Sequence, residues 1–110
     1  NTFANRAVAY DGLGNTGESI ADFKRYLALQ PGDERVVMSI AFAYRKLGRH
    51  QESLEWMDKA IAIKPEFGDY YLYRSQTRML LGDRVKARAD ADRAVQLGVK
   101  VAEGYLASLR

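Results

Sequence analysis

Apolar side chains recur along the chain at intervals of three and four residues, which is the spacing of one face of an α-helix. In the middle of the sequence Val37, Ile40, Ala41 and Tyr44 follow this spacing, and it resumes after a break at Gly48. Similar runs and breaks continue on both sides. The pattern predicts helices over residues 1–13, 16–30, 34–47, 50–64, 68–81 and 84–97, with a short helix at about 101–110.

The breaks between these helices recur with a constant period of about 34 residues, a length typical of helical repeats. Gly14, Gly48 and Gly82 are equally spaced at this period, and Pro31 and Pro65 are separated by the same interval. Glycine adopts the left-handed conformation that ends a helix without a Cβ penalty. Proline ends a helix because it has no backbone donor and clashes with the preceding turn. The chain is therefore predicted to be a tandem array of three helical hairpins with a remnant after them.

Polar residues next to these breaks are suited to starting the following helix. Asp33 is expected to cap the helix that begins near Glu34. Asn15 and Asp83 can cap the helices that follow them, whereas Arg49 has no side-chain acceptor for that purpose.

The order of small, aromatic, glycine, alanine and proline residues within the period resembles the tetratricopeptide repeat. The second unit matches it best, with Val37, Ile40, Ala41, Tyr44, Gly48, Ser53, Met57, Ala60 and Pro65 at the family's positions. The first unit holds Phe3, Ala7, Tyr10, Gly14, Ser19, Phe23 and Pro31, but has Arg6 and Tyr26 where the family has Leu and Ala. The third unit keeps Tyr71, Ser75, Gly82, Ala87 and Ala94, but has Arg74, Arg78, Ala91 and Val99 at the Leu, Tyr, aromatic and Pro positions.

This resemblance implies an all-α fold, a right-handed α-solenoid of three hairpins closed by a C-terminal capping helix. We expect one domain over residues 1–110, with repeats at about 1–33, 34–67 and 68–101 and a terminal helix at about 101–110. The start at Asn1, without an initiator Met or a leader, suggests an excerpt of a longer chain. Because one hairpin cannot cover both of its apolar faces, neighbouring hairpins must stack to bury a continuous core.

Repeats of this family line a concave groove with their first helices, and such grooves hold an extended peptide or a partner helix. The groove positions implied by the resemblance are Asn5, Val8, Met38, Ser39, Phe42, Arg45, Leu72, Tyr73, Gln76 and Met79. These residues mix apolar, amide and hydroxyl groups, as a surface that buries a partner's side chains would. The alternative is that Phe42 and Leu72 pack against neighbouring helices, or that a further repeat covers them.

The family's carboxylate clamp, which grips acidic C-termini of chaperones, is not expected here. Its positions hold Ala4, Val8, Ser39, Asp69 and Tyr73 in the register above. A shifted register recovers Asn5 and Arg35, but it leaves Ser39 where an Arg is needed.

A basic and aromatic stretch in the third unit raises the alternative of nucleic-acid binding. Tyr71 occupies a core position there, and Tyr70 is expected to pack near the preceding helix, so only Tyr73 should face the groove. The cations Arg84, Lys86, Arg88 and Arg93 are interleaved with Asp83, Asp90 and Asp92. Asp90 and Arg93 have the spacing of a helical ion pair. A solvated helix face is therefore favoured over a nucleic-acid site.

Catalytic chemistry finds no support in the sequence. The chain has no cysteine, and its one histidine, His50, lies in a turn without a motif around it. The acid pair Asp33 and Glu34 falls at a helix cap, and the nine glycines do not form a phosphate loop. We therefore expect no enzyme activity, no cofactor and no metal site. Trp56 is expected to be partly buried against an adjacent helix, and a contact on the convex surface is the less favoured alternative.

Composition narrows the class of protein further. The 110 residues are 47% apolar and 28% charged, with a formal net charge of +3, which fits one modest core. No run of about 18 to 20 apolar residues is available to span a bilayer, so membrane insertion is not expected. The absence of cysteine leaves the compartment open, with the cytoplasm slightly favoured.

The sequence thus predicts a noncatalytic scaffold that binds a protein or peptide segment in its groove. One alternative is a structural element that assembles copies of the chain through its exposed ends, at Asn1 and at the short helix after Val101. Another is weak association with nucleic acid through the third unit's arginines, although nucleic acid is the less favoured partner.

Overall fold

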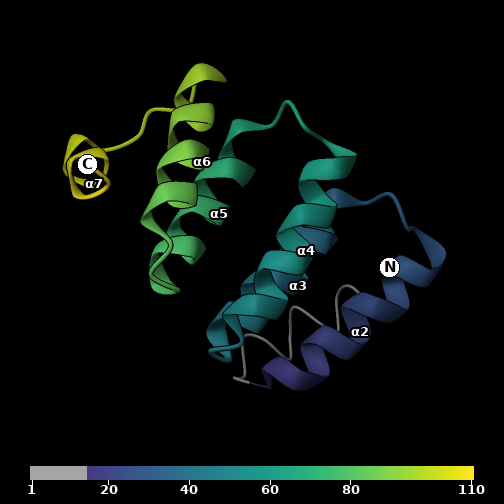
Figure 1. The fold of residues 1–110 in the computed structure, drawn as a ribbon. Coiled ribbons are helices and arrows are strands. Elements are labelled where there is room, and N and C mark those ends of the chain that lie inside the picture. Colours follow the sequence, from purple (N-terminus) through teal and green to yellow (C-terminus); the bar gives the residue numbers. More distant parts are fainter. Residues whose placement is uncertain (1–14) are drawn as a thin grey trace.

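The computed structural model describes residues 15–110, and in this part of the chain every regular element is a helix. The bounds are Thr16–Leu29 for α2, Glu34–Lys46 for α3, His50–Ile63 for α4, Gly68–Leu80 for α5, Arg84–Gln96 for α6 and Glu103–Ser108 for α7. Figure 1 shows α3 with α4 and α5 with α6 as two antiparallel hairpins, with α2 at one end of the stack and α7 at the other. The predicted helix over residues 1–13 lies outside the described residues.

The helix boundaries follow from local chemistry at the predicted breaks. Gly48 and Gly82 have φ values of 77° and 80°, so both turns within the hairpins use the left-handed region that favours glycine. The side chain of Asp33 accepts a hydrogen bond from the backbone N–H of Arg35, and Asp83 accepts one from Lys86. Asn15 makes no side-chain cap bond, which differs from the sequence prediction.

The core runs through the stack as a row of clusters between neighbouring helices. One cluster joins α3, α4 and α5 and contains Val37, Met38, Ala41, Met57, Ala60, Ile61 and Tyr70. A second joins α2 to α3 and contains Ile20, Phe23, Ile40, Ala43 and Tyr44. Trp56 is partly buried and packs against both, as the sequence predicts. Each hairpin therefore depends on its neighbours for part of its core.

The two hairpins share a serine hydrogen bond but place the serine on opposite helices. In the second unit Ser53 Oγ on α4 donates to the carbonyl of Ala41 on α3 at 2.6 Å. In the third unit Ser75 Oγ on α5 donates to the carbonyl of Ala87 on α6 at 2.6 Å. Ser75 stands one repeat period after Ala41, and Ala87 stands one period after Ser53. Each hairpin therefore keeps one small residue and one hydroxyl at the point where its helices meet.

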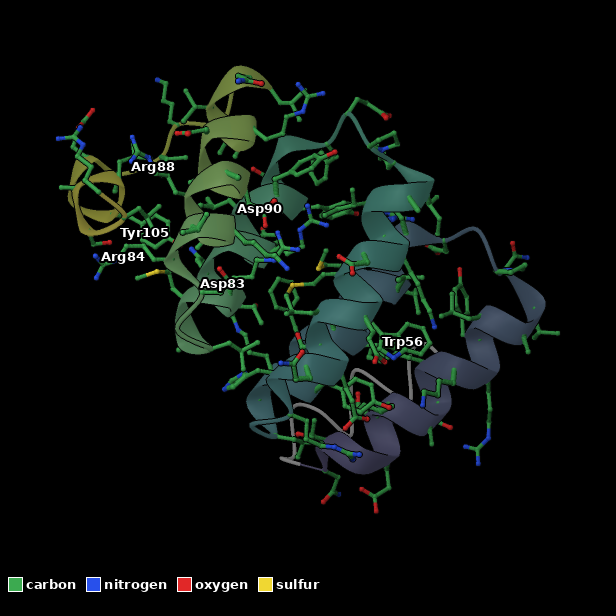
Figure 2. The ribbon with its side chains drawn as sticks, viewed as in Figure 1. Trp56, Asp83, Arg84, Arg88, Asp90 and Tyr105 are labelled. Atoms are coloured by element: carbon green, nitrogen blue, oxygen red, sulfur yellow. The ribbon has the colours of Figure 1, made fainter. Side chains whose placement is uncertain are left out.

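A buried ion network occupies the third unit, where the sequence departs most from the family pattern. Asp90 on α6 is 4% exposed, and it accepts hydrogen bonds from Arg74 Nε and Nη2 at 2.9 and 2.8 Å and from Arg78 Nη1 at 2.6 Å. Arg74 Nη1 also donates to Asp58 on α4 at 2.8 Å. The predicted pair of Asp90 with Arg93 is therefore wrong, because Asp90 points toward α5 (Figure 2) and Arg93 donates to Gln96 instead.

The contacts within this network keep the guanidinium group of Arg74 charged. Burial lowers the pKa of Arg74, but its hydrogen bonds to Asp90 and Asp58 outweigh that effect and raise the pKa above its usual value. Arg74 is therefore a permanent cation between two carboxylates. The arginines at the family's Leu and Tyr positions thus act together with Asp90 as a polar substitute for apolar packing.

The short helix α7 covers the last hairpin. Leu109, just after it, is 1% exposed and packs with Ala87 and Ala91 of α6. The hydroxyl of Tyr105 lies 2.7 Å from Ser75 Oγ, so α7 also reaches α5 (Figure 2). This arrangement matches the predicted capping helix. None of the helices from α2 to α7 combines the length and the apolar character needed to cross a bilayer.

Candidate functional site

Eight of the ten predicted groove residues come from α3 and α5, the first helices of the second and third units. Phe42 on α3 and Tyr73 on α5 meet edge to face, with ring centroids 4.8 Å apart and an interplanar angle of 73°. Both rings are half-buried and pack against the central core cluster. Edge-to-face aromatic pairs are favourable beyond the area they bury. The contact therefore ties the two units together and leaves part of each ring at the surface.

Arg45 lies beside this aromatic pair. Its guanidinium carbon is 5.4 Å from the centroid of the Phe42 ring, within the range of a cation–π contact. Its Nη1 is buried, and it has no hydrogen-bond partner among residues 15–110. A buried donor without an acceptor costs about 1 to 3 kcal/mol. Arg45 would therefore gain from an acceptor brought by a ligand.

Three further predicted residues lie half-buried along the same two helices. Ser39 Oγ donates to the carbonyl of Arg35 at 2.9 Å, so its hydroxyl proton is used within α3. Leu72 and Gln76 flank Tyr73 along α5, and both keep part of their surface open. They can provide an apolar contact and an amide on either side of the aromatic pair.

The remaining predicted groove residues have other surroundings. Met38 is 3% exposed and packs within the central core cluster, so it offers no open surface to a ligand, unlike the sequence prediction. Met79 is half-buried and packs against the cluster that α7 completes. Asn5 and Val8 lie outside the described residues. The structure thus brings Phe42, Arg45 and Tyr73 together as the centre of the candidate site.

The described residues contain no group of three or more His, Asp or Glu side chains placed to hold a metal ion. His50 begins α4, and its Nδ1 is buried without a hydrogen-bond partner among residues 15–110. Within residues 15–110 no acid or hydroxyl thus orients the imidazole through Nδ1.

The sequence did not predict one surface feature, a recess beside Trp56 that is lined by residues of α2, α3 and α4. The repeat register carried a signal for it. Trp56 stands one repeat period from both Asp22 and Asp90, so the second unit alone has an aromatic residue at that position.

The sequence is similar to known proteins along its whole length. Residues 34–107 match a family model described as "Tetratricopeptide repeat", and residues 1–33 match a second model of the same description. Tetratricopeptide repeat protein 16 of Mus musculus is 33% identical over 95 residues, covering 80% of this chain and 12% of the relative. Its Homo sapiens counterpart is 30% identical over 105 residues, covering 89% and 12%. This chain thus spans about an eighth of the length of these relatives.

Solved structures share the arrangement of the helices. The first TPR of Spaghetti (RPAP3), bound to the HSP90 peptide SRMEEVD, superposes with a TM-score of 0.87 at 19% identity, covering 98% of this chain and 87% of that one. The type III secretion chaperone SycD of Yersinia enterocolitica, in complex with a peptide of the translocator YopD, gives 0.85 at 12%, covering 98% and 86%. The all-α solenoid predicted from the sequence is confirmed, and this chain belongs to the tetratricopeptide repeat family.

Proposed function

We propose that this chain is a noncatalytic interaction scaffold that binds a peptide or a partner helix in the groove between α3 and α5. The observation that supports it is the cluster of Phe42, Tyr73 and Arg45, which joins two aromatic rings to a cation whose buried Nη1 has no hydrogen-bond partner within residues 15–110. Aromatic residues and arginine are the residue types that most often dominate binding energy at interfaces. An apolar side chain of the ligand would pack on the rings while a carbonyl or carboxylate oxygen accepts from Arg45.

Solved neighbours support a peptide as the ligand. The RPAP3 domain is bound to an HSP90 peptide, and SycD is bound to a peptide of YopD. Two residues of this chain disfavour an acidic C-terminus as its ligand. Asp69 occupies one position of the family's clamp, where it would repel a carboxylate, and the Ser39 hydroxyl proton already bonds to Arg35. The proposed ligand is therefore anchored by apolar side chains, with one acceptor at Arg45.

The test uses peptides selected on the chain itself from a random display library, followed by calorimetric titration. Tyr73→Ala should weaken the selected peptides by about tenfold or more, which is about 1.4 kcal/mol. Arg45→Gln should weaken them as well while leaving the aromatic pair in place. Val85→Ala on α6, which changes a side chain that is 83% exposed, is the matched control and should leave binding unchanged. The peptide SRMEEVD should bind at least about tenfold more weakly than the selected peptides.

Circular dichroism spectra that match the wild type would show that the variants keep their helices. Peptides that bind Tyr73→Ala and Arg45→Gln as tightly as the wild-type chain would refute the groove proposal. Strong binding of SRMEEVD would contradict the proposed ligand class and leave the groove itself in place.

The ion network weighs against the nucleic-acid alternative. Arg74 and Arg78 donate to Asp90, so two of the third unit's cations are committed within the protein. Arg84 and Arg88 are exposed on α6 (Figure 2), as are Lys86 and Arg93. Asp83 and Asp92 are interleaved with these cations, which does not favour a continuous phosphate-binding stripe. Binding to a nucleic acid that falls steeply with added salt would restore that alternative.

A further inference from the structure

A recess of about 410 Å³ opens between α2 and α4, the second helices of the first two units. Its lining comes from three helices and from the turn after α2, and it includes Leu27, Pro31, Val37, Trp56, Ala62 and Ile63. Figure 2 shows Trp56 between α4 and α2. Ile63 is 42% exposed at the edge of the recess, so the apolar surface reaches solvent. Among the described residues that line the recess, none is acidic.

The apolar character of the recess is specific to the second unit. Trp56 stands where the first and third units hold Asp22 and Asp90. Its neighbour in the core is Ile40, which stands where the third unit holds Arg74. Arg74 and Asp90 form an ion pair at 2.8 Å, whereas Trp56 packs against the apolar cluster that contains Ile40. Repeat architecture alone therefore does not require an indole at this place.

The recess is open because the residue at its floor is small. The equivalent of Val37 in the third unit is Tyr71, whose hydroxyl donates to the carbonyl of Pro65 at 2.8 Å. The guanidinium carbons of Arg74 and Arg93 lie 5.6 and 6.0 Å from the Tyr71 ring centroid. Tyr71 and the two arginines thus occupy the equivalent place between α4 and α6, and a smaller recess of about 250 Å³ between these helices lies elsewhere, beside Leu54 and Lys86. Between α2 and α4, Val37 leaves that volume free.

Two ammonium groups lie next to the indole. Lys59 lines the recess, and its Nζ is 3.9 Å from the Trp56 ring centroid. Lys24 Nζ is 5.5 Å from the same ring and donates to the Tyr44 hydroxyl at 2.8 Å. Neither lysine pairs with a carboxylate within residues 15–110. The surface therefore combines an apolar floor with a positive rim.

We propose that this recess is a second docking site, separate from the groove between α3 and α5, and that it binds an acidic amphipathic helix of a partner protein. Two apolar side chains on successive turns would pack against Trp56 and Ile63, and a carboxylate would meet Lys59. A two-fold pairing of the recess with itself would bring Lys59 against Lys59, which disfavours a second copy of the chain as the occupant.

Trp56 is the only tryptophan in the chain, so its fluorescence reports on the recess directly. The probes are two synthetic amphipathic peptides of about 15 residues, the length at which isolated helices become viable. Both carry the same leucine stripe, and one has glutamate flanks where the other has lysine. The acidic peptide should shift the Trp56 emission to shorter wavelength in a saturable manner. The basic peptide should bind at least about tenfold more weakly.

Ala62→Glu places a carboxylate at the edge of the recess and should weaken the acidic peptide by about tenfold or more. Ala28→Glu makes the same change one repeat earlier, at a residue that does not line the recess, and should leave binding unchanged. Lys59→Met should reduce the preference for the acidic peptide. Both alanines are exposed, so these variants test docking without disturbing the core.

Equal binding of the two peptides, or equal effects of the two glutamate variants, would overturn the proposal. Loss of binding in Tyr73→Ala would also overturn it, because the peptide would then occupy the groove. A dimer in sedimentation analysis that Ala62→Glu dissociates would make a second copy the occupant and contradict an acidic partner helix.

Discussion

The ion network of the third unit makes a quantitative prediction about stability. Asp90→Ala removes a carboxylate that is 4% exposed and accepts three hydrogen bonds from two arginines. The side chains of Arg74 and Arg78 are only 17% and 19% exposed, so both lose a partner in partly buried surroundings. Removing one member of a buried ion pair costs about 3 to 5 kcal/mol. Arg74 keeps Asp58, so we expect the lower end, about 3 kcal/mol.

The assay is urea unfolding followed by circular dichroism, with hydrogen exchange to locate the loss. Asp92→Ala is the matched control, because Asp92 is an exposed acid two residues away on α6 and should cost less than about 0.5 kcal/mol. Exchange should rise first in α5 and α6, since stability in a repeat stack is a sum of local terms. If Asp90→Ala and Asp92→Ala unfold at the same urea concentration, the network does not stabilise the third unit.

The positions one repeat period earlier provide the residues for a rescue. The positions one repeat period before Asp58, Arg74, Arg78 and Asp90 hold Lys24, Ile40, Tyr44 and Trp56. These four residues also contact one another, since Lys24 lies over the rings of Tyr44 and Trp56, and Ile40 packs beside them. Replacing a whole buried ion network with apolar residues is often neutral or stabilising. Placing these four residues at the four positions of the network should therefore recover most of the stability that Asp90→Ala loses.

Other buried groups in the structure give three more predictions. Gly68→Ala should destabilise the chain by about 1 to 3 kcal/mol although alanine favours helices, because the new Cβ would lie 2.5 Å from Val99 Cγ2 and 3.0 Å from Leu97 Cβ. The assay is urea unfolding, and the control is Gly17→Ala, where the new Cβ has open space around it. A Gly68→Ala variant more stable than the wild type would contradict this prediction. Burial raises the pKa of Tyr70 above its ordinary value of 10.0, so the neutral phenol stabilises the fold below about pH 10 and that contribution disappears as the pH rises through the folded-state pKa. Tyr70→Phe should accordingly lose less stability between about pH 9 and pH 11 in unfolding experiments, and an unchanged pH profile would refute this role. Ser75→Ala removes the hydroxyl that joins α5 to Ala87 and to Tyr105, so it should cost about 1 kcal/mol and speed hydrogen exchange in α7, whereas unchanged exchange there would show that the serine does not hold α7.

The helices could be predicted because their signals are local. The predicted span 34–47 became Glu34–Lys46 and the span 50–64 became His50–Ile63, with similar agreement for the helices that follow. Apolar periodicity, glycine at positive φ and an aspartate cap each act within a few residues. Three repetitions at a constant interval then determined how the hairpins stack, because each copy repeats the same small and large positions.

The pairing of Asp90 could not be obtained from local spacing. Arg93 is three residues away and suits a helical pair, but Arg74 and Arg78 reach the carboxylate from α5 with three hydrogen bonds. Tertiary geometry decided between them, since several charge-assisted bonds in a buried place outweigh one exposed pair. Met38 shows the same limit. Its repeat position suits the groove, but its long side chain fills a gap in the core below.

Comparison of equivalent positions within this one chain separates what the fold requires from what it leaves free. Ser53 with Ala41 and Ser75 with Ala87 exchange helices, and in both hairpins the same hydrogen bond forms. The fold therefore constrains the combination of a hydroxyl and a small residue and leaves open which helix carries each. Trp56 and Val37 behave differently from these serines. In the third unit their equivalents, Asp90 and Tyr71, are held by contacts within the protein, whereas in the second unit Val37 leaves the recess open. At the positions of Trp56 and Val37 the second unit differs from the third unit, and the difference exposes apolar surface. Selection for binding a partner explains that difference better than selection for stability does.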